Sequence, residues 1–146
     1  MSLPSATILT TSSAKHHAHL VSLGANHCFE RSAQDDTSAI KAATSDGAGV
    51  DAILDAVSAT ADQPAVFSAL NSIGPKIYVQ VFSGLKVEVP AGINSTIVMG
   101  RQVFDAESGM QAMARLESLL ESWKYRLPVK VEVVGKGMVP LSREWI

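Results

Sequence analysis

Short runs of apolar and β-branched residues alternate along the chain with segments whose apolar positions recur at helical spacing. The runs predict strands over residues 6–11, 26–29, 50–57, 76–82, 95–99 and 129–134. The segments between them predict helices over residues 14–23, 35–45, 60–74 and onward from 105. Strands that alternate with helices in this way are typical of a parallel sheet with right-handed crossovers, so we expect an α/β fold.

The ends of these helices carry signals of their own. Ser12 or Ser13 stands where it can cap the first helix, and Gly24 stands where a left-handed residue can close it. Asp105 is expected to cap the last helix. Along that helix, apolar side chains recur three or four residues apart and predict a stripe that faces a core, formed by Met110, Met113, Leu116, Leu120 and Trp123.

Composition places the chain among ordinary globular proteins. It has 146 residues, 47% of them hydrophobic and 18% charged, which suits a single domain over residues 1–146. The formal net charge is −2 and the basic residues are scattered, so we expect no nucleic-acid partner. A single cysteine, Cys28, favours a reducing, cytoplasmic location. The chain shows neither a leader pattern nor an apolar stretch long enough to span a membrane, so no membrane association is expected.

Four phrases of the sequence, in this order, resemble a known family. They are TSSAKHHAHLVSLGANHCFE, GAGVDAILDAVS, ALNSIGPKIYVQVF and LPVKVEVVGKG. Together they resemble the cofactor domain of the medium-chain dehydrogenases and reductases, in particular the zinc-free quinone and enoyl reductase branch and fungal members that act beside polyketide synthases. The resemblance spans roughly residues 6–138. It implies a doubly wound, Rossmann-like and mostly parallel sheet that lacks its first strand and its C-terminal end, and hence a single truncated domain.

The resemblance also implies parts that the sequence does not contain. In the family, a catalytic domain and a strand with a glycine-rich turn precede the matching region, and the turn holds the cofactor pyrophosphate. The one literal match to the glycine pattern is GAGVDA, residues 47–52, which stands after a predicted helix and before a predicted strand. Because the pattern needs a strand before it and a helix after it, we interpret residues 47–52 as a loop.

The missing first strand would normally lie between the strands predicted over residues 6–11 and 50–57. Its absence leaves two apolar strand edges without a partner, which favours association. We expect either that these two strands pair with each other or that a second copy of the chain fills the gap. A homodimer through the open sheet edges is therefore predicted.

Two groups near the first predicted helix are candidates for binding. Ser12, Ser13 and Lys15 match the place where NADP-preferring relatives hold the 2′-phosphate, so the resemblance implies a vestigial NADP phosphate position; the alternative is a helix cap with a solvated lysine. A second group comprises His16, His17, His19 and His27. No acidic or cysteine ligand accompanies these histidines, so no metal site is expected. Cys28 is interpreted as a packed thiol.

Candidate catalytic residues lie where predicted parallel strands end, since parallel sheets place ligands there. Asp55 lies near the carboxyl end of its strand and becomes a candidate general acid or base if burial raises its pKa. Tyr78, Gln80 and Ser83 lie at the strand end that lines the nicotinamide pocket in relatives, and Arg101 follows the next strand. Their phenol, amide and guanidinium groups are candidates for contact with a substrate carbonyl; the alternative is a polar crevice inherited from an ancestor.

Three functions remain open at this point. The preferred hypothesis is a cofactor-independent cyclase, cycloaddition catalyst or isomerase that binds an apolar polyketide- or terpenoid-type metabolite in a repurposed reductase crevice, because positioning alone lowers the barrier to an intramolecular reaction. The second is part of an NADPH-dependent enoyl or quinone reductase, with NADP as cofactor. The third is a non-catalytic partner subunit of a larger biosynthetic enzyme.

Overall fold

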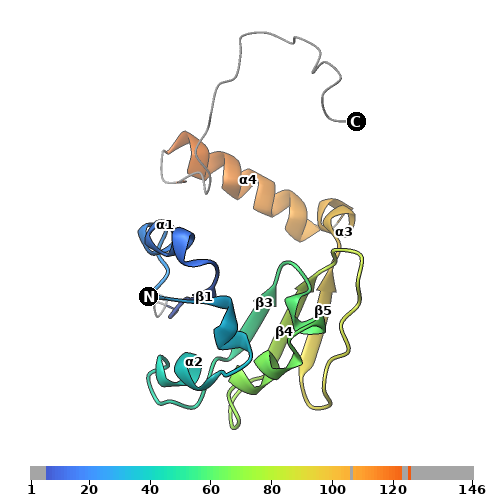
Figure 1. Cartoon of the computed structure of the whole chain (residues 1–146). Helices are drawn as coiled ribbons and strands as arrows, with labels where there is room; N and C mark the ends of the chain where they lie inside the picture. The colour runs from blue at the N-terminus through green and yellow to red at the C-terminus, as the bar shows by residue number, and fades with distance from the viewer. Residues whose placement is uncertain (1–5, 106, 123–124, 126–146) are drawn as a thin grey trace, which may run out of the picture.

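The protein has an α/β fold whose strands are all parallel to their neighbours. The computed structural model describes residues 6–105, 107–122 and 125. Figure 1 shows the strands below one long helix, and the parallel Rossmann-like arrangement expected from the sequence is confirmed. Within the described residues the strands are β1 (Leu9–Thr11), β2 (His27–Phe29), β3 (Ala52–Asp55), β4 (Ile77–Val81) and β5 (Asn94–Val98).

The N-terminal unit is a strand, a helical segment and a second strand. A 3-10 turn, η1 (Ala14–His16), runs into α1 (His17–Ser22), and β2 then pairs with β1. Gly24 ends the helix as predicted: its φ is 113°, its N–H bonds the Val21 carbonyl at 3.0 Å, and the Ala25 N–H reaches back to Leu20 O at 3.0 Å. These two bonds satisfy carbonyls that the helix leaves unpaired at its C-terminus. A 3-10 turn, η2 (Arg31–Gln34), and α2 (Ser38–Ala42) follow.

The core lies under the second sheet, where β3, β4 and β5 are joined in that order. Two 3-10 segments, η3 (Ala59–Ala61) and η4 (Pro64–Ala69), connect β3 to β4. The buried cluster consists of Phe67, Leu70, Tyr78 and Val87. The rings of Phe67 and Tyr78 meet edge to face with centroids 4.9 Å apart, a preferred aromatic geometry.

Two helices are shorter than the sequence predicts. The helix expected over residues 35–45 is limited to α2, and the one expected over residues 60–74 is replaced by η3 and η4 and ends before Gly74. Gln63 separates the two 3-10 segments with a φ of −126° and a ψ of 66°. The residue before a proline is disfavoured in the helical region, so Pro64 explains the break.

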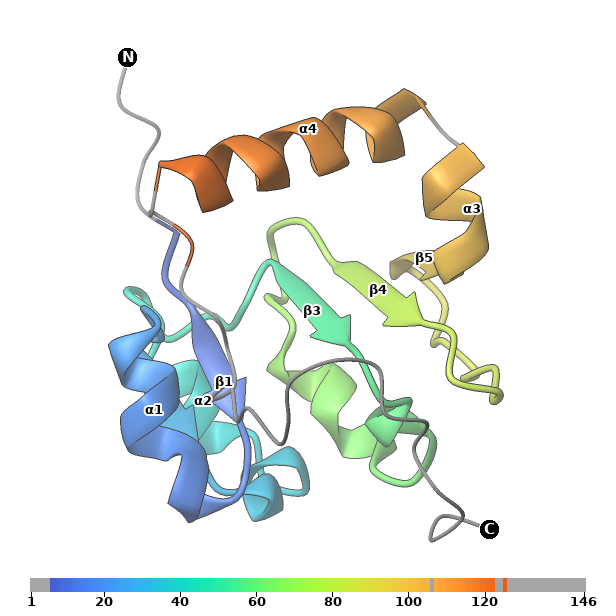
Figure 2. The ribbon, with the colours of Figure 1, turned by 90° about the horizontal axis from the view of Figure 1, so that it is seen from above.

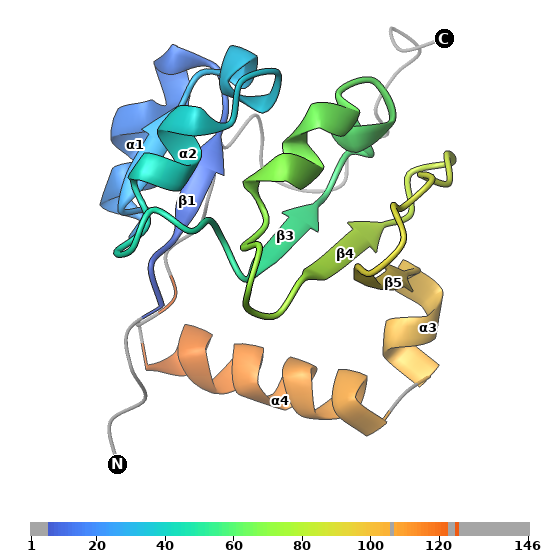
Figure 3. The ribbon, with the colours of Figure 1, turned by 90° about the horizontal axis from the view of Figure 1, so that it is seen from below.

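In the described part of the chain the strands form two separate sheets, and β1 is not joined to β3. Figures 2 and 3, seen from opposite sides, show β1 and β3 running in the same direction with no described strand between them. Of the two arrangements expected from the sequence, direct pairing of these strands is therefore wrong. Among the described residues, the chain leading into β3 is covered on this side by an isolated bridge between Val50 and Leu70.

The C-terminal helix differs from its prediction in two ways. The chain is already helical in α3 (Gly100–Asp105), and α4 (Glu107–Glu121) follows, so Asp105 ends one helix rather than capping the next. The stripe does not face a core within the described residues: Met110 is 65% exposed and Met113 51%, whereas Leu116 is half-buried. The cause is the position of α4, which adjoins α3 and stands apart from the sheets (Figure 1). Trp123 and the strand predicted over residues 129–134 lie outside the described residues.

None of the helices in residues 6–105 and 107–122 combines the length and the apolar character that crossing a bilayer requires.

The glycines before β3 provide a test of this packing. Gly49 has a φ of 116°, and a Cβ there would lie 2.4 Å from Ala69 O and 3.0 Å from Asn71 N. Gly47 has a φ of 68° with nothing within 4 Å of such a Cβ. We expect Gly47→Ala to destabilise by about 1–2 kcal/mol through backbone strain alone. Gly49→Ala should cost about 1–3 kcal/mol more because it also forces two chain segments apart.

Urea unfolding of the two variants measures this difference. Equal free energies of unfolding for Gly47→Ala and Gly49→Ala would contradict the close backbone approach at Gly49.

Candidate functional site

Three of the predicted site residues meet near the carboxyl ends of β3 and β4. Asp55 is paired in register with Gln80. Two residues earlier along both strands, Ile53 is paired with Tyr78. Because residues two apart in a strand share a face, Asp55, Tyr78 and Gln80 all point towards the core side of the sheet. All three are buried: Asp55 is 6% exposed, and Tyr78 and Gln80 are each 1% exposed.

The Asp55 carboxylate is the centre of this cluster. Its Oδ1 accepts the N–H groups of Val57 at 3.1 Å and Ala59 at 3.0 Å. Its Oδ2 accepts the Thr60 N–H at 3.0 Å, the Thr60 hydroxyl at 2.6 Å and the Tyr78 hydroxyl at 3.0 Å. Five donors therefore converge on one side chain, and the segment that follows β3 folds around it.

The protonation of Asp55 follows from these bonds. Burial acts to raise the pKa of the carboxyl group, but the hydrogen bonds from Thr60, Ala59 and Val57 stabilise its ionised form and lower the pKa below its ordinary value. The condition under which Asp55 was a candidate general acid or base, a pKa raised by burial, is therefore not met. Asp55 is an anion at neutral pH with its acceptor sites engaged.

Tyr78 is held in its protonated form by the same cluster. Burial raises the pKa of its phenol to about 12; the bond with Thr60 opposes this, while the bond to Asp55 and its negative charge add to it. The hydroxyl also bonds the Thr60 Oγ1. Tyr78 is thus a neutral donor directed at Asp55.

Gln80 organises a second loop beside the first. Its Nε2 donates to Ser58 Oγ at 2.8 Å and to the Leu85 carbonyl, and its Oε1 accepts the Val87 N–H at 3.3 Å. Ser58 in turn lies 2.7 Å from the hydroxyl of Ser83. The amide therefore ties the loop after β3 to the loop after β4.

Sequence reasoning did not identify Ser58 and Thr60. Ser58 is 5% exposed and has a φ of 57°, a left-handed conformation that is uncommon for a residue other than glycine. Such strain persists where surrounding contacts hold it, here the bonds to Gln80 and Ser83. The only signal in the sequence was the presence of two small hydroxyl residues three and five positions after Asp55.

Arg101 stands apart from this cluster. It follows β5 in the first turn of α3, at the same carboxyl edge of the sheet, and is exposed. The structure thus brings Asp55, Tyr78 and Gln80 together and leaves Arg101 on the rim. Catalytic roles for these four residues stay predictions. The hydrogen bonds of Asp55 and Gln80 fix the shape of two loops at the carboxyl ends of the strands, where parallel sheets bind ligands.

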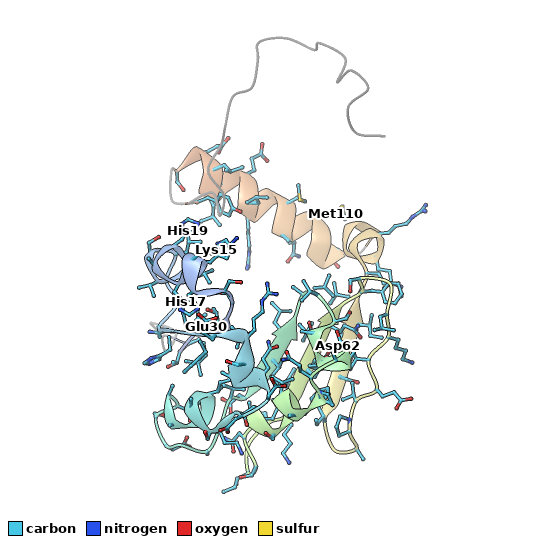
Figure 4. All side chains as sticks on the ribbon, viewed as in Figure 1. Lys15, His17, His19, Glu30, Asp62 and Met110 are labelled. Carbon is cyan, nitrogen blue, oxygen red and sulfur yellow. The ribbon has the colours of Figure 1, made fainter. Side chains whose placement is uncertain are left out.

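The second candidate group follows β1. Ser13 occupies the N-cap position of η1, as expected, but its side chain makes no capping hydrogen bond. Ser12 Oγ donates to the Ser13 carbonyl at 3.3 Å, and the Ser12 carbonyl lies 3.2 Å from His17 Nε2. Lys15 is exposed, and Figure 4 shows it on the same short segment as His17 and His19. Two half-buried hydroxyls and an exposed cation are thus grouped at the end of a parallel strand.

The remaining candidate residues, the four histidines and Cys28, lie in the N-terminal unit. No group of three or more His, Cys, Asp or Glu side chains within the described ranges is placed to hold a metal ion. His27 stacks on Phe29 with centroids 6.4 Å apart. Cys28 is a free, half-buried thiol that accepts a hydrogen bond from Thr10 at 3.3 Å and lies 3.7 Å from the His17 carbonyl. This agrees with the packed thiol predicted from the sequence.

The glycine pattern at residues 47–52 is a loop, as predicted. It follows α2 and leads into β3, and Gly49 is used for the close approach to Ala69 described above. In the part of the chain that the structure describes, no glycine-rich turn joins a strand to a helix. The described residues therefore do not contain the backbone cradle that holds a pyrophosphate.

No family model and no curated protein matches the chain. Solved structures share its fold. The CurK enoyl reductase covers 80% of this chain with a TM-score of 0.61 and 18% identity. A protein named as an NADPH:quinone reductase from Bacillus thuringiensis covers 82% with a TM-score of 0.63 and 20% identity. The CurF ER cyclopropanase of the curacin A pathway covers 79% with a TM-score of 0.56 and 16% identity.

The chain spans only 36–38% of the length of these three structures. At such identities the likeness establishes the fold. It confirms the Rossmann-like arrangement of enoyl and quinone reductase cofactor domains that the sequence resemblance implied.

The role of Asp55 can be tested through acid stability. A depressed folded-state pKa contributes stability that is present above the unfolded value of about 3.8 and is lost as the pH falls through the folded value. We expect Asp55→Asn to lower the free energy of unfolding by roughly 2–4 kcal/mol at pH 7, because charge-assisted bonds are lost and the amide NH2 faces other donors. The difference from the unsubstituted protein should shrink below pH 4.

Asp62→Asn is the matched control, since Asp62 is an exposed aspartate directly after η3 (Figure 4). Urea unfolding between pH 2 and pH 7 provides the measurement. If Asp55→Asn behaved like Asp62→Asn at pH 7, the Asp55 cluster would not organise the loop.

The raised pKa of Tyr78 predicts alkaline behaviour. A folded pKa of about 12 against an ordinary value of 10.0 contributes stability that is fully present below pH 10 and is lost as the pH rises through 12. Absorbance at 295 nm should show a phenol titrating near 12 that Tyr78→Phe removes. A Tyr78→Phe titration curve identical to that of the unsubstituted protein would contradict this assignment.

Proposed function

We propose that the chain forms part of the nucleotide domain of an NADP-linked oxidoreductase of the enoyl or quinone reductase type. Within this function, Ser12, Ser13 and Lys15 contact the 2′-phosphate of the cofactor. The observation that carries the proposal is the grouping of these three residues at the end of β1, with the Ser13 hydroxyl not used for capping. Reductases with the same fold support it.

The chemistry of the group fits a phosphate monoester. Serine hydroxyls donate hydrogen bonds to phosphate oxygens, and a lysine ammonium supplies the opposite charge. Lys15 is exposed, so it reaches the phosphate without the penalty of a buried charge. The proposed contact is limited to this end of the cofactor, because the described residues include no cradle for the pyrophosphate.

When bound, NADPH supplies hydride for reduction. The loops held by Asp55 and Gln80 then border the ligand-binding edge of the sheet, where fixed backbone positions exclude water and orient a substrate. Arg101, exposed on the same rim, is the cation available to contact a substrate oxygen or a phosphate. In this function Asp55, Tyr78 and Gln80 are positioning residues.

A second candidate is the cofactor-independent cyclase or isomerase acting on an apolar metabolite. One observation favours it: a protein named as a cyclopropanase has the same fold, with a TM-score of 0.56. In such a catalyst the rigid loops after β3 and β4 would fix the conformation of the substrate, and pre-organisation would lower the barrier to ring closure. The two candidates differ in whether the chain binds a nicotinamide cofactor.

Discrimination between NADPH and NADH tests the first proposal. We expect the chain to bind NADPH more tightly than NADH and Lys15→Ala to weaken NADPH binding about tenfold, since one charge-assisted contact is worth roughly 1.5–3 kcal/mol before solvent screening. NADH binding should be unchanged by the substitution. Isothermal titration calorimetry with both cofactors provides the measurement.

The control is Lys76→Ala. Lys76 precedes β4 at the amino end of that strand, whereas ligands bind at the carboxyl ends, so its removal should leave both affinities unchanged. Equal loss of affinity in the two variants would indicate nonspecific attraction of a polyanion. No binding of NADPH at millimolar concentration would overturn the reductase proposal, and turnover of an apolar polyene without nicotinamide would favour the second candidate.

A further inference from the structure

One face of the second sheet is largely exposed. Side chains alternate along a strand, so Val79 points away from the core side that Tyr78 and Gln80 share. Leu54 is paired with Val79 in register and points the same way. Leu54 is 71% exposed and Val79 is half-buried. We call this the outer face, and its other apolar side chains are Ala52, Ile77, Val81 and Val98.

A parallel sheet normally has both of its faces covered. In α/β proteins the helices lie on both sides of such a sheet, because an exposed apolar face is unfavourable in water. Here the core side is covered by η4, whose Phe67 packs its ring on that of Tyr78. The fold therefore requires a second layer over the outer face.

The helix α4 lies on the side of the outer face. Figures 2 and 3, seen from opposite directions, both place β3 and β4 between α4 and the segments α2 and η4, the latter drawn in green. Figure 1 shows α4 above the strands and next to α3. The helix is thus positioned over the outer face, yet its side chains Met110 and Met113 are exposed. This arrangement is an open one.

The apolar stripe of α4 matches the outer face in character and in reach. The outer-face positions of β3, β4 and β5 include no charged residue, so contact with the stripe buries no charge. The 15 residues of α4 span about 22 Å, whereas the axes of β5 and β3 are about 10 Å apart. From its α3 end, α4 therefore reaches across all three strands. The described stripe consists of Met110, Met113, Leu116 and Leu120.

Packing is also what a helix of this kind needs for its stability. Isolated helices of up to roughly 15 residues are marginal in water, and most helical stability in proteins comes from the packing of an amphipathic face. Gly109 in the first turn of α4 weakens it further. We propose that α4 closes onto the outer face as a lid, with Met113 packed on Val79 and Leu54. The closure does not depend on nucleotide binding.

Amide hydrogen exchange of α4 in the full chain tests the closure. We expect slow exchange along α4, and Met113→Asp to speed it at least about tenfold by placing a charge in the closed contact. Gln111→Asp is the matched control, because Gln111 is exposed and lies on the opposite side of the helix from Met113. Its exchange should stay as in the unsubstituted protein. Rapid exchange along α4 without any substitution, or equal effects of the two substitutions, would overturn the proposal.

Methyl contacts in the unsubstituted protein decide the matter if Met113→Asp fails to fold. Nuclear Overhauser contacts between the methyl group of Met113 and those of Val79 and Leu54 are expected within one labelled chain at a monomeric mass. The same contacts seen only between differently labelled chains, with a dimeric mass by light scattering, would identify α4 of a second copy as the cover and overturn the intramolecular lid. An absence of contacts of either kind would overturn it as well.

Discussion

The structure depends on one buried carboxylate. Asp55 ends β3 and accepts hydrogen bonds from Val57, Ala59, Thr60 and Tyr78, so the chain beyond the strand turns back over the core instead of continuing as sheet. The negative charge makes each of these bonds stronger than a neutral one and keeps the site ionised. Since Tyr78 also packs its ring on Phe67, the same contact links the polar loop to the apolar cluster.

The sequence predicted those elements whose pattern is local. The alternation over residues 76–82 matches β4, and Gly24 closes α1 as expected because a left-handed position favours glycine. It failed where the conformation of a loop decides the outcome. Burial acts to raise the pKa of Asp55, but the loop that follows β3 directs hydrogen-bond donors of Val57, Ala59 and Thr60 at the carboxylate and lowers the pKa.

The sequence predicted only part of the candidate site. Parallel strands bring their carboxyl ends together, so the proximity of Asp55, Tyr78 and Gln80 followed from strand order. The sequence did not predict that the polar atoms of these side chains bond Ser58, Thr60 and the loop backbones. A left-handed conformation such as that of Ser58 cannot be recognised from the presence of a serine. The sequence predicted that the stripe on α4 faces a core, but Met110 and Met113 are exposed, because a pattern does not specify what an apolar face meets. Nor did the sequence decide how β1 and β3 are arranged: in the described part of the chain they belong to separate sheets.

The central claim is that the segment after β1 recognises the 2′-phosphate of NADP. Backbone amide chemical shifts of the labelled chain, followed by NMR during titration with NADPH and separately with NADH, test it most directly. The account predicts that NADPH shifts the amides of Ser12, Ser13 and Lys15 and that NADH does not shift them. Shifts of equal size with both cofactors, or none at these residues, would contradict it.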